Sequence, residues 1–135
     1  MKKIQIPLYP RKLWLIDDPD DFENFTFVLG GGNNKEVSLD FESICDKLLL
    51  MTHAVIDNET GDYGVIVYFN MNEDLHTGDL AHESVHVVDY VFDELGMYSQ
   101  CYQDGNEPYA YLIGWVAQQL KDYYDDRRKQ EPVEA

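Results

Sequence analysis

The chain of 135 residues has few of the features that mark secreted, cysteine-rich or membrane proteins. Its only cysteines are Cys45 and Cys101, without a short CxxC spacing, so we expect neither a disulfide framework nor a cysteine-rich zinc site. No apolar run approaches the length of about 18 residues that a membrane-spanning helix needs. Residues 1–10 also lack the apolar core of a signal peptide. We therefore expect a soluble cytoplasmic protein with reduced thiols.

Basic residues are also few. Lys and Arg number 10 against 26 Asp and Glu, which gives a formal net charge of −16. A field of this sign repels nucleic-acid phosphates and anionic lipids, so we expect no direct contact with nucleic acid or a membrane. It can instead attract a basic partner. One candidate function is therefore an acidic interaction or inhibitor protein that mimics nucleic acid.

The rest of the composition is that of a folded chain. Hydrophobic residues make up 44% and aromatic residues 13% of the sequence, which is typical of a globular protein. The length suits one hydrophobic core, so we expect residues 1–128 to form a single domain. The polar residues 129–135 are expected to be a solvated tail. No internal repeat is visible.

The most informative stretch is HESVH, formed by His82 to His86 within TGDLAHESVHVVDYVFDELG. On a helix, residues four apart share a face, so both imidazoles can converge on one metal ion while Glu83 reaches a water beside it. Thr77 can cap the start of such a helix and Gly96 suits its end. We expect a helix over 77–96. Its expected buried stripe is Leu80, Ala81, Ser84, Val85, Val88, Val91, Phe92 and Leu95.

Two histidines do not complete a catalytic zinc site, which needs three protein ligands and one open position. Asp89 lies one turn past His86 on the same straight helix, too far along the axis to be the third ligand. A second helix is predicted over Asn106–Leu120, with Pro108 in its first turn. Glu107 begins that helix and is the best candidate for the third ligand. The alternative is an amphipathic helix that carries two surface histidines.

HESVH followed by NE at the start of a second helix resembles the gluzincin branch of zinc metallopeptidases. More narrowly, the run Leu80–Gln118 is similar to small single-domain zincin-like proteins encoded by bacteriophages. The resemblance implies that His82, His86 and Glu107 bind Zn²⁺. It also implies that Glu83 is the general base in peptide-bond hydrolysis.

Other residues can support the metal ligands or contact the substrate. Many gluzincins carry an Asp or a similar polar residue one turn after the ligand glutamate, but this chain has Tyr111 there. Asp89 can instead support a ligand histidine. His76, just before the metal helix, can reach the cleft rim and contact a developing oxyanion, or be a loop residue without a role. The other candidates for that contact are Tyr98, Tyr102 and Tyr109, for which a role as packing aromatics is the stronger interpretation.

The N-terminal half is expected to supply a small sheet. Pro7 and Pro10 interrupt residues 3–16, which therefore form an edge strand or two short strands. Gly30–Gly32 lacks the GxxxxGK[ST] pattern of a phosphate-binding loop and is expected at a hairpin tip. The other predicted elements are a turn or short helix at 17–24, a strand at 25–29, a helix at 39–51 after a Ser38 cap, and a hairpin with arms 53–57 and 63–70. We expect Val65, Val67 and Phe69 of the second arm to be buried in the core.

Together these patterns predict an α+β fold of the minimal zincin-like type, a small and mostly antiparallel sheet packed against the HExxH helix and a second, crossing helix. The predicted function is a monomeric zinc metallopeptidase that acts on a peptide or protein, in the host cytoplasm if a phage encodes it. The alternative is the acidic interaction or inhibitor protein with a structural metal. Structural zinc sites are normally closed by four protein ligands, and the sequence offers three, which favours the enzyme.

Overall fold

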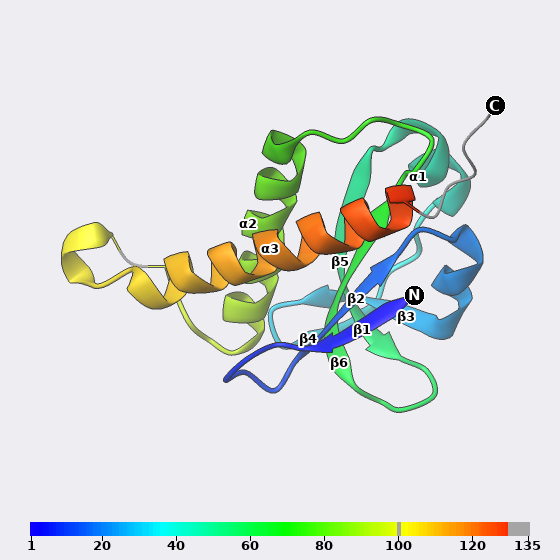
Figure 1. Cartoon of the computed structure of the whole chain (residues 1–135). Helices are drawn as coiled ribbons and strands as arrows, with labels where there is room; N and C mark the ends of the chain where they lie inside the picture. Colours follow the sequence, from blue (N-terminus) through cyan, green and yellow to red (C-terminus); the bar gives the residue numbers. More distant parts are fainter. Residues whose placement is uncertain (100, 130–135) are drawn as a thin grey trace.

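The computed structural model describes residues 1–99 and 101–129, which form a six-stranded sheet with helices on both faces (Figure 1). The strands are β1 (Lys2–Gln5), β2 (Lys12–Ile16), β3 (Phe25–Gly30), β4 (Asn33–Glu36), β5 (Leu50–Asp57) and β6 (Tyr63–Phe69). The helices are α1 (Phe41–Lys47), α2 (Thr77–Glu94) and α3 (Glu107–Lys129), with short 3-10 turns η1 (Pro19–Asn24) and η2 (Tyr102–Asp104). The predicted α+β class is confirmed.

The sheet has the strand order β1-β2-β6-β5-β3-β4 and is mixed. Only β2 and β6 run parallel, whereas β1–β2, β5–β6, β3–β5 and β3–β4 are antiparallel. A parallel pair needs a long connection, and here the whole segment from η1 to β5 separates the two strands. The interruption at Pro7 and Pro10 does give two strands. However, β2 lies inside the sheet, so the predicted edge position holds only for β1.

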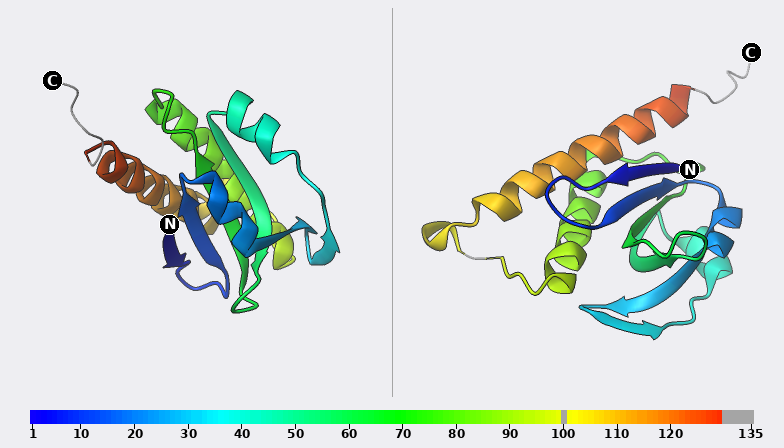
Figure 2. Two further views of the ribbon diagram at one scale, coloured as in Figure 1. Left: turned by 90° about the vertical axis from the view of Figure 1, so that its right-hand side faces the viewer. Right: turned by 90° about the horizontal axis from the view of Figure 1, so that it is seen from below.

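β6 is apolar along most of its length because both faces of the sheet are covered. Val65, Val67 and Phe69 are fully buried against α2 and α3, as the sequence predicted. Ile66 and Tyr68 point to the other face, where aromatic residues of η1 and α1 pack on them. Figure 2 shows this layering, with α2 and α3 on one side of the sheet and α1 on the other. The sequence of β6 therefore reads as a continuous apolar run.

α3 crosses α2 on the outside of the molecule (Figure 1). Leu112, Val116 and Leu120 bury their side chains in the core shared with α2. Near its C-terminus, the Tyr124 hydroxyl accepts a hydrogen bond from the backbone N–H of Leu75, at 3.0 Å. These contacts fix α3 against the start of α2, and the predicted crossing of the two helices is confirmed.

Helix boundaries show where the sequence patterns were wrong. α1 ends at Lys47, and the apolar residues Leu50 and Met51 belong to β5 because they pair with β6. The cap of α1 is Asp40, whose side chain accepts from the Ser43 N–H, and not Ser38. α3 continues to Lys129 instead of ending at Leu120, so the tail was predicted to begin one residue too early. Residues 130–135 lie outside the described part of the chain.

The strand β4 was not predicted because its residues are all polar and exposed. It forms because Gly30, Gly31 and Gly32 all take positive φ, which turns the chain back on β3. The hairpin tip also lies close to α2. A Cβ added at Gly31 would stand 2.7 Å from a carboxylate oxygen of Asp93. Glycine is therefore required there by conformation and by space.

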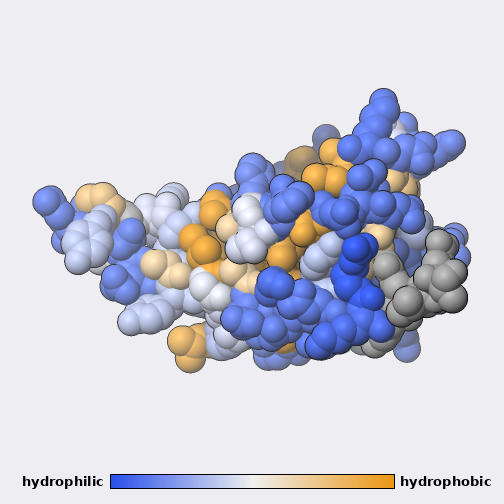
Figure 3. All heavy atoms as spheres, turned by 45° about the horizontal axis from the view of Figure 1, so that its top comes forward, coloured by the Kyte–Doolittle hydropathy of each residue, from blue (hydrophilic) through white to orange (hydrophobic). Residues whose placement is uncertain are grey.

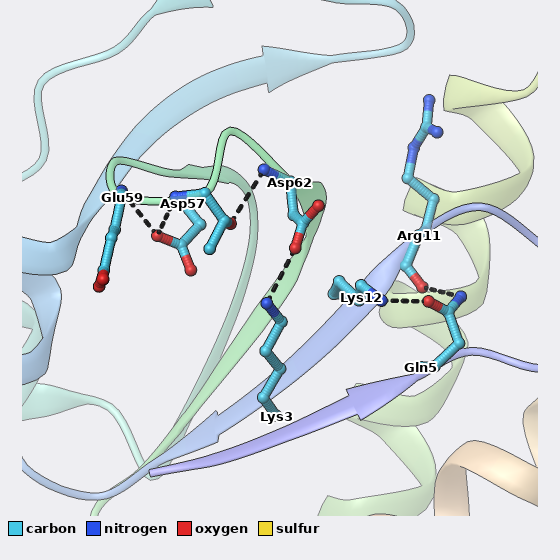
Figure 4. A network of polar contacts seen from close by, with 8 residues as sticks. Lys3, Gln5, Arg11, Lys12, Asp57, Glu59 and Asp62 are labelled. Atoms are coloured by element: carbon cyan, nitrogen blue, oxygen red, sulfur yellow. Dashed lines mark hydrogen bonds and ion pairs between the residues drawn. The ribbon is translucent and has the colours of Figure 1, made fainter.

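A polar network holds the β1 edge of the sheet (Figure 4). The Lys3 ammonium binds the Asp62 carboxylate at 2.8 Å, which ties β1 to the turn between β5 and β6. Within that turn, the Asp57 carboxylate accepts from the backbone N–H of Glu59 at 2.9 Å.

In the part of the chain that the structure describes, no helix is long and apolar enough to cross a bilayer.

Gly64 offers a test of the parallel pairing. A Cβ at this position would overlap the carbonyl oxygen of Lys12 and lie 2.8 Å from the Trp14 ring. We expect Gly64→Ala to lower the free energy of unfolding by about 3 kcal/mol in urea titrations, since neither the strand nor the buried ring can move away. Gly78→Ala is the control, because a Cβ there meets nothing within 4 Å and should stabilise α2 by up to about 1 kcal/mol. Equal unfolding midpoints for both variants would contradict the β2–β6 register.

Candidate metal centre

The helix α2 has well-defined ends. Its N-cap is His76, one residue before the predicted Thr77, and the Asp79 side chain accepts the His76 backbone N–H at 2.9 Å. At the C-terminus, Gly96 takes φ 69° and its N–H donates to the Asp93 carbonyl. The Met97 N–H donates to the Phe92 carbonyl at 2.7 Å. This pair of bonds is a Schellman motif, so the predicted role of Gly96 is confirmed.

The buried face of α2 differs slightly from the predicted stripe. Val87 is fully buried although it was not predicted, whereas Ala81 and Val85 are exposed. The face has rotated because both the sheet and α3 cover the helix. Ser84 is buried and satisfies its hydroxyl by donating to the Leu80 carbonyl at 2.7 Å. The buried residues of α2 are Leu80, Ser84, Val87, Val88, Val91 and Phe92.

This packing leaves His82 and His86 together on the solvent side. Their Nε2 atoms are 3.0 Å apart and their ring centroids 4.7 Å apart. Zn–N bonds of about 2.0–2.1 Å at a tetrahedral angle would place two such nitrogens about 3.3 Å apart. Two neutral rings can also hold this distance through one N–H···N hydrogen bond. The ring spacing therefore fits a shared metal ion after an adjustment of a few tenths of an ångström.

Glu83 joins the two histidines. The ligand atoms of His82, Glu83 and His86 lie within 4.8 Å of one another, the only such group of at least three His, Cys, Asp or Glu in the described ranges 1–99 and 101–129. Both histidines are exposed and Glu83 is half-buried. The Thr52 hydroxyl on β5 donates to Glu83 Oε2 at 2.5 Å. Thr52 therefore fixes the carboxylate beside the imidazoles.

Two hollows flank the group, one toward each end of α2. The first, of about 410 Å³, is bordered by His82, Glu83 and the segment Lys47–Leu50. The second, of about 420 Å³, extends from His86 past Asp89 to Tyr98. A chain bound across the histidines would therefore find room for a side chain in each direction.

Asp89 links the candidate centre to α3. Its Oδ1 accepts from the Tyr109 hydroxyl at 2.6 Å, and the Tyr109 ring packs edge-on against Phe92. Burial raises the pKa of Tyr109 to about 12, and the hydrogen bond to Asp89 adds to the rise. Asp89 also borders the same hollow as His86. Its predicted part in supporting a ligand histidine stays a prediction, since the bond that the structure contains runs to α3.

Glu107 begins α3, as predicted, but the structure does not bring it into the group formed by the two histidines and Glu83. It is exposed and borders a different groove, of about 500 Å³, together with Pro7, Leu8 and Tyr9. Tyr109, two residues further along, faces α2 instead. The ligand role of Glu107 therefore stays a prediction, and it requires a different side-chain direction from the one observed.

The other two histidines lie apart from the group. His76 at the N-cap has a side chain that is 84% exposed, with its Nδ1 3.7 Å from Asp79, and it borders neither flanking hollow. Its predicted contact with an oxyanion has no support from this placement. His53 packs between the rings of Phe27 and Tyr90. Its Nδ1 lies 2.9 Å from the Ala54 carbonyl oxygen, which suits a structural role.

Two residues that the sequence did not single out contribute to the site. Thr52 is one residue of a strand and belongs to no motif. Its hydroxyl reaches Glu83 only because β5 pairs with β6 beneath α2. Tyr90 is half-buried beside the hairpin tip, and burial, followed by the charges of Glu83 and Glu94, raises its pKa. Neither could be found from spacing, because both depend on how the sheet meets α2.

Comparisons with protein-family models, with curated proteins and with solved structures find no match to this chain. The case for any function therefore depends on the residues and their geometry.

The Tyr109–Asp89 bond predicts a pH dependence. Because the folded state raises the Tyr109 pKa from about 10 to about 12, its stabilising contribution is fully present below about pH 10 and is lost as the pH rises through about 12. We expect the difference in unfolding free energy between wild type and Tyr109→Phe to be constant below about pH 10 and to shrink above it. Tyr102→Phe, which removes an exposed hydroxyl on η2, is the control. Urea titrations across this range measure the effect, and a difference that does not change with pH would contradict the assignment.

Proposed function

We propose that the protein is a zinc-dependent metallopeptidase whose centre is formed by His82, Glu83 and His86. The observation that carries the proposal is that the Nε2 atoms of His82 and His86 meet at 3.0 Å on the open side of α2 with a carboxylate beside them. Bound Zn²⁺ in such a site supplies Lewis acidity, which activates water near neutral pH and polarises a carbonyl group.

The residues of the chain have separate roles in the proposed reaction. The two imidazoles hold the metal through their Nε2 atoms. Glu83 takes a proton from the attacking water and returns it to the leaving amine, which is the role of a general base and then acid. Thr52 positions Glu83, because its hydroxyl occupies Oε2 and leaves the other carboxylate oxygen for the proton. Glu83 is consequently assigned to proton transfer and not to the metal.

The surroundings favour an extended peptide over a small molecule. The two hollows lie on opposite sides of the histidine pair along α2, and with volumes of about 420 and 410 Å³ each has room for a large side chain. Exposure of both imidazoles leaves the centre open to a chain that passes over the surface. Hydrophilic residues cover much of one face of the molecule around a band of apolar residues (Figure 3), as the net charge of −16 would suggest.

The role of Glu83 can be separated from metal binding. We expect Glu83→Gln to keep its zinc content and to lose at least about 10²-fold of the cleavage rate on a library of quenched fluorescent peptides. Thr52→Val should keep its zinc as well. Its cleavage rate should fall less than that of Glu83→Gln, and the pH dependence of the rate should change, because the Glu83 carboxylate remains but no longer accepts the Thr52 hydrogen bond. Glu59→Gln, in the β5–β6 turn, is the matched control with no expected effect. Loss of zinc from Glu83→Gln would show that Glu83 is a ligand instead.

The third ligand is tested by zinc affinity in competition with a chelator. His82→Ala and His86→Ala should each abolish measurable binding, whereas His76→Ala should bind like wild type. If Glu107 completes the site, Glu107→Ala should weaken binding far more than Asp89→Ala, for which about 10- to 100-fold is typical of a supporting residue. A Glu107→Ala variant with wild-type affinity would remove Glu107 from the ligand set.

A further inference from the structure

The hollow beside His86 has a composition unlike the rest of the centre. Its volume is about 420 Å³, and its lining joins acidic, aromatic and thioether side chains from the second half of α2 and from residues 97–99. The hollow begins at one of the two proposed metal ligands. A side chain adjacent to the bond being cleaved would therefore enter it.

Two acidic residues line this hollow. Asp89 and Asp93 are four residues apart on α2, so they lie one above the other on the helix surface. The Tyr109 hydroxyl holds Asp89 in place at 2.6 Å. The Asp93 side chain has no hydrogen bond or ion pair to any residue in the described part of the chain. Apart from His86, the lining contains no basic side chain to neutralise the pair.

The remaining walls suit a long aliphatic stem. Tyr90, Met97 and Tyr98 border the hollow, and Met97 is placed there by the Gly96 turn that ends α2. A lysine or arginine side chain can lie along such apolar surface while its charged end reaches a carboxylate. The hollow on the other side of the histidines contrasts with this one, because its lining includes Lys47, Leu48 and Leu49.

We propose that the hollow lined by Asp89 and Asp93 is a specificity pocket for a lysine or arginine side chain of the substrate. The protein would then cleave peptides next to a basic residue. This inference rests on the proposed peptidase function, but its pocket can be tested without catalysis. The net charge of −16 would draw basic segments toward the surface before they enter the pocket.

The test uses three synthetic peptides that differ at one position, which carries lysine, norleucine or glutamate. Norleucine keeps the unbranched apolar stem of lysine and lacks the charge. We expect the lysine peptide to bind metal-stripped wild type at least about 10-fold more tightly than the norleucine peptide in fluorescence anisotropy, the usual scale for a charge-assisted contact. The glutamate peptide should bind least. The preference for lysine should fall when the salt concentration rises.

Variants assign the preference to the pocket. Asp93→Asn should reduce the ratio of lysine to norleucine affinity by about 10-fold, and Asp93→Lys should reverse the preference toward the glutamate peptide. Asp126→Asn, on the exposed side of α3, removes the same charge elsewhere and should leave the ratio unchanged. Circular dichroism of each variant verifies that the fold is retained.

The outcomes separate the two proposals. Equal affinity for lysine and norleucine peptides, or an equal effect of Asp93→Asn and Asp126→Asn, would overturn the pocket. Cleavage by the zinc-loaded protein without preference for lysine would overturn it too, while leaving the peptidase intact. Binding that depends on Asp93, without cleavage of any peptide, would support the pocket and count against the proposed chemistry alone.

Discussion

The arrangement of the candidate centre depends on how α2 is packed. Val87, Val88 and Val91 are fully buried in the core that α2 shares with the sheet and α3. Burying an aliphatic side chain of this size contributes about 1.5–3 kcal/mol, so a rotation of α2 that exposed these residues would be strongly unfavourable. With that face fixed, His82 and His86 can only lie on the side that neither the sheet nor α3 covers.

The same packing brings in groups from distant parts of the chain. β5 lies beneath α2, so the Thr52 hydroxyl reaches Glu83, 31 residues later in the sequence. On the other side, α3 presents the Tyr109 hydroxyl to Asp89. Glu83 and Asp89, the acidic residues next to the histidines, therefore each accept a hydrogen bond from an uncharged hydroxyl group. A neutral donor stabilises the charged carboxylate without supplying a positive charge that would compete with a cation at the imidazoles.

Much of the fold and of the candidate site could be predicted from the sequence where a local pattern dominates. The spacing of HESVH gave a helix with adjacent imidazoles, and Gly96 correctly marked its end, because 3.6-residue periodicity and a positive-φ glycine act locally. Val65, Val67 and Phe69 were predicted to be buried because a β-prone run of this kind has few alternatives. These features need no knowledge of the rest of the fold.

Other features depend on tertiary contacts and could not be predicted. The polar strand β4 has no apolar alternation and exists only because three glycines turn it onto β3. Met51 continued a helical pattern but joins β5, since pairing with Tyr68 outweighs local propensity. The direction of Glu107 was the least predictable. Its helix and position were right, but the rotation of α3 about its axis, set by Leu112, Val116 and Leu120, places Glu107 at the groove that it borders with Pro7–Tyr9.

The central claim is that both imidazoles of the α2 pair bind one metal ion through Nε2. The most direct measurement is a long-range ¹H–¹⁵N spectrum of the histidine rings during a Zn²⁺ titration of the whole protein. The account predicts that the Nε2 resonances of His82 and His86 move together and stop moving at one equivalent of zinc, while those of His53 and His76 stay in place. Unchanged His82 and His86 resonances, or saturation only together with His76, would contradict it.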